Sequence, residues 1–382
     1  MNESLLAALG EVIDPELRRP ITEMGMVSRA ELVDGVAHVG IRLTIEGCPL
    51  KNTIQDDVRQ AVGRVEDVQE VRIDLDYMNA EQRRSLKDAL GHTKVNPFAS
   101  PDNLTQVYAI ASGKGGVGKS TVTANLAASL ASSGLAVGIV DADVHGFSIP
   151  GLLGVQQPPT KLDDMILPPV VEVPQELRHQ PEGRQPGSIR VISIGMFVEG
   201  NQPIAWRGPM LHRALEQFLT DVHFGDLDVL LLDLPPGTGD IAISMSQLVP
   251  KANLVMVSTP QAAAVDVAER AGTISLQTGQ TVLGVVENMA AMVMPDGSTM
   301  EMFGSGGGQL LADRLTKALD ADVPLLGSVP LDMSLRSGGD CGVPVVWSAP
   351  ESPSGSALRD VAQSIRGQRR GLAGKSLPLN LL

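Results

Sequence analysis

The glycine-rich stretch GKGGVGKS, Gly113–Ser120, is the feature that most constrains how this chain can fold. It follows a strand-like apolar run (VYAIAS) and precedes a helical run (TVTANLAASL). Glycines let backbone N–H groups converge on phosphate oxygens, and the N-terminus of the following helix adds favourable partial charge. The pattern predicts a phosphate-binding loop, the P-loop, built from Gly113, Lys114, Gly115, Gly116, Val117, Gly118, Lys119, Ser120 and Thr121.

The last side chains of this loop are expected to act on a nucleoside triphosphate. Lys119 is predicted to reach the β- and γ-phosphates, and the Ser120 hydroxyl is predicted to bind Mg²⁺. Lys114 is a second lysine inside the loop, at a position that most such loops leave free. The expected ligands are therefore ATP and Mg²⁺.

Two strand-like runs end in aspartates. The run LAVGIV leads into Asp141 and Asp143, and DVLLLD ends at Asp233 before PPGTGD. Because residues i and i+2 of an extended chain share a face, both carboxylates of the first pair are expected to point into the phosphate crevice. Asp143 would orient the attacking water, Asp141 would support the Mg²⁺ shell and Asp233 would hold a Mg²⁺-bound water. A single such aspartate is often only a helix N-cap, but two beside a P-loop indicate a catalytic centre.

From Gln106 onward, short apolar runs alternate with helical patterns, which predicts an α/β fold: a P-loop NTPase with a mostly parallel sheet and helices on both faces. The Pro-rich segment 155–189 is expected to be an inserted hairpin or flexible loop. Apolar positions 358, 361, 362 and 365 predict a last surface-packed helix rather than a membrane-binding one. The predicted strands lie at 106–112, 135–140, 190–195, 228–233, 253–258, 281–286 and 325–329.

Residues 1–84 form a different pattern, which predicts a small α+β domain ahead of the NTPase. An apolar helix, two strand-like runs, a helix over 49–63 and a closing strand follow one another. Residues 85–105 lose this periodicity and gain Pro, Asn and Ser, so they are predicted to be a linker. The NTPase domain is expected to span 106–366, with a flexible tail over 367–382.

Composition restricts the binding partners and the cellular compartment that we expect for this chain. A formal net charge of −14 argues against nucleic-acid binding by broad phosphate neutralisation. The start of the chain lacks the pattern of a signal peptide, and no stable membrane anchoring is expected. The two cysteines, Cys48 and Cys341, exclude a disulfide framework and favour a reducing compartment, which predicts a cytoplasmic protein.

Beyond the P-loop, a set of motifs resembles one family. GKGGVGKST, DADVHGFS, WRGPM, LDLPPGTGD, GVVENM and FGSGGG together are similar to the Mrp/ApbC ATPases, iron–sulfur cluster carrier proteins of the MinD/ParA-like superfamily. This resemblance spans roughly residues 100–350. Through DPEL and LTIEGCP, the first 80 residues resemble the small domain often fused ahead of these ATPases and also found in iron–sulfur assembly factors.

The resemblance implies an ATPase that forms ADP and phosphate and delivers clusters to apo-proteins. It implies a homodimer that sandwiches two ATP molecules, with each Lys114 reaching the phosphates bound by the other subunit. It also implies that Asn288 recognises adenine.

One stretch departs from the family pattern. After VENM, family members usually carry two cysteines that flank a proline, and two subunits bridge one cluster through them. Alignment on VVENM places Met294 and Gly297 at those positions. A thioether is a poor substitute for a thiolate and glycine has no side chain, so the usual bridged cluster cannot form.

Three functions therefore remain open on the sequence. The first is an iron–sulfur cluster carrier with other ligands, for which Cys48 is the candidate thiol because a helix N-terminus favours thiolate. The second is an ATP-switched dimeric interaction protein that carries no cluster. The third, a MinD- or ParA-like positioning ATPase, is disfavoured by the acidic charge and the tail.

Overall fold

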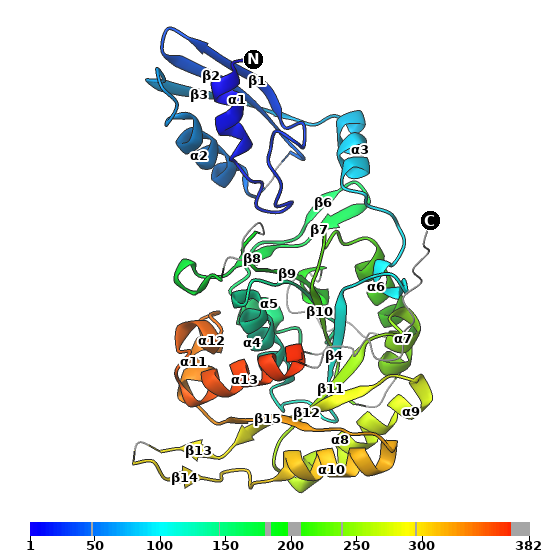
Figure 1. Cartoon of the computed structure of the whole chain (residues 1–382). Helices are drawn as coiled ribbons and strands as arrows, with labels where there is room; N and C mark the ends of the chain where they lie inside the picture. The colour runs from blue at the N-terminus through cyan, green and yellow to red at the C-terminus, as the bar shows by residue number, and fades with distance from the viewer. Residues whose placement is uncertain are drawn as a thin grey trace, which may run out of the picture.

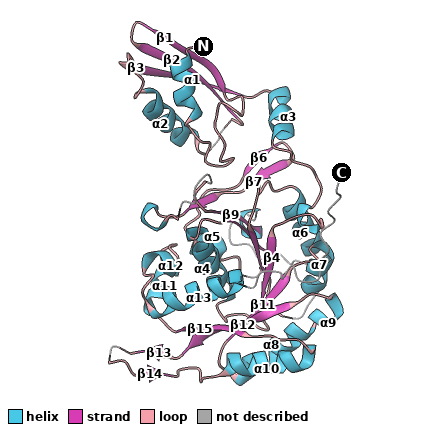
Figure 2. Ribbon diagram, in the orientation of Figure 1, coloured by secondary structure: helices cyan, strands magenta, loops and turns pink. Residues whose placement is uncertain are grey.

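Two bodies of unequal size make up the protein (Figure 1). The computed structural model describes residues 1–46, 49–144, 146–179, 185–197, 208–237, 240–294 and 296–367. The N-terminal part holds a three-stranded sheet, and the rest is built on an eight-stranded sheet with helices on both faces (Figure 2). No helix in these ranges is long and apolar enough to cross a membrane.

The small N-terminal domain folds as the sequence pattern predicts. Strand β2 lies between β1, to which it is antiparallel, and β3, to which it is parallel. Helix α2 begins at Lys51 with Leu50 as its N-cap, two residues later than predicted, and Cys48 lies outside the described residues. The elements are α1 (Glu3–Gly10), β1 (Val27–Val33), β2 (Val36–Leu43), α2 (Lys51–Val62) and β3 (Glu70–Tyr77).

The segment assigned to a linker is in part helical. Helix α3 (Ala80–Ala89) runs across the predicted boundary, and a 3₁₀ turn, η1, covers Pro97–Ala99. The α3 N-terminus is closed by a capping box in which the side chains of Asn79 and Gln82 each accept from the other residue's backbone N–H. Leu86 is its one buried residue, so the helix has too narrow an apolar stripe for periodicity to reveal it.

The large sheet has the order β15-β12-β11-β4-β10-β5-β9-β8. All neighbours are parallel except β8 and β9, which confirms the mostly parallel sheet; the antiparallel edge strand β8 was not predicted from the sequence. The strands are β4 (Gln106–Ala111), β5 (Ala136–Asp141), β8 (Val170–Glu172), β9 (Ser188–Ser193), β10 (Val229–Asp233), β11 (Asn253–Ser258), β12 (Val282–Ala290) and β15 (Leu325–Pro330).

Helices cover both faces of this sheet, and each face has its own apolar core. On one face the core joins α6 (Gly208–Thr220), α7 (Asp240–Leu248), α8 (Ala262–Thr273) and α10 (Gly307–Leu319). On the other it joins α4 (Lys119–Ser132), α5 (Ile149–Leu152), α12 (Val345–Ser348) and α13 (Pro353–Gly367). The residues predicted to face the core from the last helix, at 358, 361, 362 and 365, are all buried. The shorter elements are η2 (Gln175–Leu177), η3 (Ile194–Phe197), α9 (Ser275–Thr278) and α11 (Met333–Asp340).

The inserted segment is a hairpin, and it packs on the small domain. Strands β6 (Thr160–Leu162) and β7 (Met165–Leu167) are antiparallel and lie between the two bodies (Figure 1). Leu162, Met165 and Leu167 are fully buried and belong to the small domain's core rather than to either core of the large sheet. Part of the NTPase chain thus completes the hydrophobic core of the N-terminal domain.

Polar contacts reinforce this packing. The Thr160 hydroxyl donates to Glu16 Oε1 at 2.5 Å, and both side chains are buried. At the rim, Arg83 pairs with Asp163 at 3.1 Å, and Asp164 pairs with Lys87 and Lys94. Burial raises the pKa of Glu16 to about 7, the Thr160 hydrogen bond opposes this rise, and the charge of Asp14 adds to it.

The raised pKa of Glu16 makes the free energy of unfolding depend on pH. The folded chain binds more protons than the unfolded chain between the ordinary carboxyl pKa and about 7, so stability falls as pH rises through that window. Replacing Glu16 by Gln removes this loss, which amounts to at most about 3 kcal/mol. The free energy of unfolding, measured with urea at pH 5 and at pH 8, should therefore decrease less between these two pH values in Glu16→Gln than in the wild type.

The matched control is Glu11→Gln, because Glu11 is exposed and lies in the same segment. It should keep the wild-type decrease. Equal decreases in Glu16→Gln and the wild type would contradict the buried contact with Thr160.

Candidate functional site

The P-loop connects the carboxyl end of β4 to the N-terminus of α4, which begins at Lys119. Gly118 is the N-cap with φ 78°, a left-handed conformation that favours glycine. A Cβ at Gly118 would lie 2.2 Å from Asn288 Nδ2, and a Cβ at Gly113 would lie 2.4 Å from the backbone nitrogen of Ala268. Glycine at these two positions is thus required by backbone conformation and by close packing.

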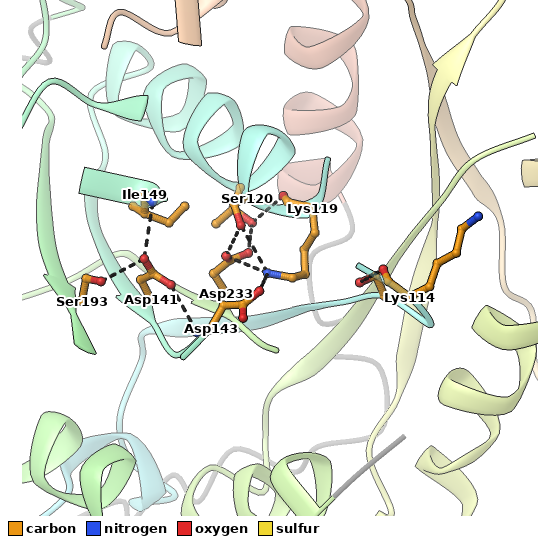
Figure 3. A network of polar contacts seen from close by, with 10 residues as sticks. Lys114, Lys119, Ser120, Asp141, Asp143, Ile149, Ser193 and Asp233 are labelled. Atoms are coloured by element: carbon orange, nitrogen blue, oxygen red, sulfur yellow. Dashed lines mark hydrogen bonds and ion pairs between the residues drawn. The ribbon is translucent and has the colours of Figure 1, made fainter. Parts of the chain in front are cut away.

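Asp233 is the centre of the polar network at this loop (Figure 3). Its strand β10 lies between β4 and β5, so Asp233 stands beside Ile110 and Asp141 in the sheet register. One carboxylate oxygen, Oδ2, accepts from Ser120 Oγ at 2.5 Å and lies 2.7 Å from Lys119 Nζ. The other, Oδ1, accepts from Thr123 Oγ1 at 2.8 Å. The fully buried carboxylate is therefore held by three side chains of α4.

The aspartates after β5 take two different positions. Asp143 lines the cleft, with Oδ2 3.5 Å from Lys119 Nζ. Asp141 Oδ2 instead accepts from Ser193 Oγ at 2.9 Å and from the Ile149 N–H at 3.4 Å. The Asp143 carboxylate thus faces Lys119 in the crevice, whereas the Asp141 carboxylate accepts from Ser193, from Ile149 and from the Asp143 N–H; its role toward Mg²⁺ stays a prediction. Strand β5 ends at Asp141, so the two-residue alternation of an extended chain does not continue to Asp143.

Electrostatics make this centre a place for a cation. Burial, and next the negative charge of Asp233, raise the pKa of Asp141, whereas its bonds from Ser193 and the Asp143 N–H oppose the rise. Lys119 is a single positive charge among these carboxylates, and it is itself buried. A divalent cation would favour the ionised form of each carboxyl group.

The cleft beside these groups can accept phosphate groups and Mg²⁺. It has a volume of about 310 Å³, and the Ser120 hydroxyl and carboxylate oxygens are the hard oxygen ligands that Mg²⁺ prefers. The P-loop thus stands where sequence analysis predicts it. The lining consists of Ser112, Lys114, Gly115, Gly116, Val117, Gly118, Lys119, Ser120, Thr121, Asp143, Gly146, Ser148 and Pro236.

Lys114 points away from this network (Figure 3). Its Nζ donates to Gln261 Oε1 at 3.1 Å, at the start of α8. The two lysines of the loop therefore have different environments: Lys119 is paired with carboxylates inside the cleft, and Lys114 is half-exposed at its rim.

Asn288 packs against the P-loop. Its side chain is 4% exposed, and Nδ2 donates to the Val117 carbonyl oxygen at 2.8 Å. This contact was not foreseen from the sequence; its role toward adenine stays a prediction. Thr123 and Ser193 were also missed. Thr123 could have been found, because it lies four residues after Lys119 and so on the same face of α4.

The hairpin after β12 contains Met294 and Gly297, the two positions at which the family resemblance implies cysteines. Strands β13 (Met292–Val293) and β14 (Thr299–Met300) are antiparallel, and the Met294 N–H donates to the Ser298 carbonyl at 2.8 Å. Gly297 has φ 82°, as the tight turn requires. No thiol lies in the described part of this hairpin, and across the described ranges no three His, Cys, Asp or Glu residues gather as a metal site.

Cys341, the second cysteine of the chain, lies at the end of a short helix. It is exposed and caps the C-terminus of α11. The glycines around it are compatible with a short helix here because α11 packs against α5 and α12.

A cavity of about 710 Å³ between the small domain and β8 is larger than the cleft at the P-loop. Three of its charged side chains pair: Glu172 Oε1 lies 3.5 Å from Arg18 Nη1, and Glu172 Oε2 lies 2.6 Å from Arg178 Nη2. It has no phosphate-binding loop, so the candidate site is the smaller cleft.

Comparisons with known proteins agree with this geometry. The profile of the NUBPL iron-transfer P-loop NTPase family matches residues 103–366, and that of an iron–sulfur cluster assembly protein matches residues 2–74. The chain is 56% identical to an iron–sulfur cluster carrier protein of Mycobacterium tuberculosis, over 100% of this chain and 97% of that one. It is 41% identical to one of Deinococcus radiodurans, over 96% and 95%.

Among solved structures, a nucleotide-binding protein from Archaeoglobus fulgidus in complex with ADP is similar with a TM-score of 0.52. It is 35% identical and covers 65% of this chain and 91% of its own. This match is the size of the large domain alone.

Replacing Lys119 by Ala should weaken ATP binding roughly 100-fold, because a buried charge-assisted contact to phosphate is lost. Titration with a fluorescent ATP analogue measures the dissociation constant. Lys317→Ala, which removes an exposed lysine of α10, is the matched control and should bind as the wild type does. Unchanged affinity in a folded Lys119→Ala protein would exclude this cleft as the nucleotide site.

Proposed function

The chain belongs to the NUBPL iron-transfer P-loop NTPase family, and on this premise we propose that it binds and hydrolyses ATP to carry iron–sulfur clusters and deliver them to apo-proteins. The observation that carries the proposal is the buried convergence of Lys119, Ser120 and Asp233 at the P-loop. The N-terminal match to an iron–sulfur cluster assembly protein supports the cargo.

The residues of the cleft have distinct roles in hydrolysis. Lys119 and the P-loop N–H groups hold the β- and γ-phosphates. Ser120 and Asp233 would hold Mg²⁺, with Asp141 supporting its outer shell, and the ion would neutralise phosphate charge. Asp143, the aspartate that lines the cleft, positions the water that attacks the γ-phosphorus. The water oxygen bonds to the γ-phosphorus as the bond to the bridging oxygen breaks, the bridging oxygen stays on ADP, and both protons of the water leave with the released phosphate.

The working form is a homodimer in which Lys114 acts across the interface. Its side chain is turned away from the carboxylates of its own cleft, and its Nζ makes an exposed contact to Gln261. Releasing that contact is inexpensive because it is exposed. Lys114 is therefore free to reach phosphates bound by a second copy of the chain.

The cargo needs ligands other than residues 294 and 297. We assign the thiol of Cys48 from each of two subunits to this role, with the remaining ligands supplied by a thiol cofactor or by the client protein. The low cysteine content suits a reducing compartment, so the cytoplasm is the proposed location.

A second candidate function follows from the same hairpin. Because Met294 and Gly297 provide no thiolate, an ATP-switched dimer that docks client proteins without carrying a cluster also fits the structure.

Asp143→Ala should leave ATP binding intact and lower steady-state turnover roughly 100-fold or more, because the water is no longer positioned. Phosphate release measures turnover, and equilibrium binding is measured in parallel. Asp88→Ala, an exposed position of α3, is the control and should turn over normally. Normal turnover in Asp143→Ala would mean that another group positions the water.

Anaerobic incubation with iron and sulfide should give the wild type the visible absorption of an iron–sulfur cluster, with matching iron and sulfide content. Cys48→Ser should lose that cluster, whereas Cys341→Ser should keep it. Cluster retained in Cys48→Ser would overturn the ligand assignment. A colourless wild-type protein that still hydrolyses ATP and binds apo-clients would instead support the interaction protein.

A further inference from the structure

The β13–β14 hairpin carries methionines at neighbouring positions of one face. Met292 and Met300 are direct partners in the antiparallel register. Met294 follows the end of β13, but its N–H donates to the Ser298 carbonyl oxygen across the hairpin, so the antiparallel register continues to this residue and Met294 lies diagonally across from Met300. Directly opposed Cβ atoms are about 5 Å apart and diagonal ones about 7–8 Å, within reach of long side chains. Three thioethers can therefore converge on one point.

These methionines are not core residues. Met300 is 48% exposed, and Met292 and Met294 are half-exposed. The hairpin extends away from the body of the sheet (Figure 1). Met302, 59% exposed, follows two residues after Met300 and adds a fourth thioether to the segment. None of the four is fully buried, in contrast to Met245 and Met256 of the large domain.

The donor set selects the class of ligand. Thioethers are soft, neutral donors that suit Cu(I) and not Mg²⁺ or Ca²⁺. They need no deprotonation, unlike thiols and imidazolium groups. The adjoining turn carries an acidic residue: Asp296 Oδ1 accepts from the Ser298 N–H at 2.9 Å and from Ser298 Oγ at 2.6 Å.

We propose that Met292, Met294 and Met300 form a surface site for a soft monovalent cation, Cu(I) in a reducing compartment. Iron–sulfur clusters are held by thiolates, so the thioethers of this hairpin are not suited to bind a cluster. They are suited to a soft cation. The site is independent of nucleotide hydrolysis and of the cluster ligands assigned above.

The hairpin is nonetheless tied to the nucleotide site through β12. Asn288 contacts Val117 of the P-loop, and a Cβ at Gly118 would lie 4.0 Å from the terminal methyl of Met289. The proposed site therefore begins four residues after Asn288, whose side chain contacts the loop.

The test uses the full-length chain with Cys48→Ser and Cys341→Ser, so that thiols cannot bind the metal. Under anaerobic conditions this protein is titrated with Cu(I) in competition with a chromogenic Cu(I) chelator, and with Ag(I) as a redox-inert probe. We expect one ion per chain, and nuclear magnetic resonance shifts of the isotope-labelled methyl groups of Met292, Met294 and Met300.

The decisive variant is Met292→Leu with Met300→Leu, which keeps apolar volume and removes two thioethers. It should weaken Cu(I) and Ag(I) binding at least about tenfold, since even the loss of a supporting contact costs that much. Met333→Leu, at a 73% exposed position of α11, is the control and should bind as its parent does.

Unchanged affinity in the double leucine variant, or methyl shifts that are as large at Met333 as in the hairpin, would overturn the proposal. So would the absence of binding once both cysteines are replaced. Retained ATP binding in every variant confirms that the chain is folded when these outcomes are read.

Discussion

The buried carboxylate of Asp233 is the constraint on which the rest of the site depends. A fully buried charge is stable only when it is paired and hydrogen-bonded, and Asp233 obtains its partners from one helix: Lys119, Ser120 and Thr123 of α4. The central position of β10, between β4 and β5, places that carboxylate where the P-loop begins and where Asp141 ends its strand. The order of the strands, the position of α4 and the charge pairing of Asp233 therefore depend on one another. The phosphate-binding cleft lies beside these groups.

The second organising contact joins the two domains. The β6–β7 hairpin leaves the large domain and places Leu162, Met165 and Leu167 in the small domain's core. Buried apolar area of this kind resists separation of the domains, and the Glu16–Thr160 hydrogen bond gives it one specific register. The β6–β7 hairpin is followed in the chain by β8, which pairs with β9 at the edge of the large sheet. The same hairpin packs in the core of the domain that matches iron–sulfur assembly proteins. The fold provides a physical link between the NTPase sheet and that domain.

Much of the architecture was predictable because it is written in local patterns. The run VLLLD is buried on both faces and reads as a central parallel strand, which it is, and the spacing in α13 identifies its four buried positions correctly. Prediction failed where a segment's signal was weak or its partner was distant. Helix α3 buries only Leu86, and β8 has three residues, of which none is fully buried. Helix α2 begins at Lys51 rather than Pro49, a difference that only the local backbone decides.

The sequence by itself determined the P-loop, the strand-end aspartates and the absence of thiols at positions 294 and 297, because each depends on residue types at fixed places along the chain. Only the tertiary structure decided that Asp141 turns to Ser193 while Asp143 faces Lys119, that Asn288 braces Val117, and that Thr160 meets Glu16. These contacts join residues that are far apart in the chain. Lys119 and Asp143 are 24 positions apart, and Val117 and Asn288 are 171 positions apart. Such pairs depend on how whole helices and strands pack and on the free-energy cost of burying an unpaired polar group. A local sequence pattern reveals neither of these.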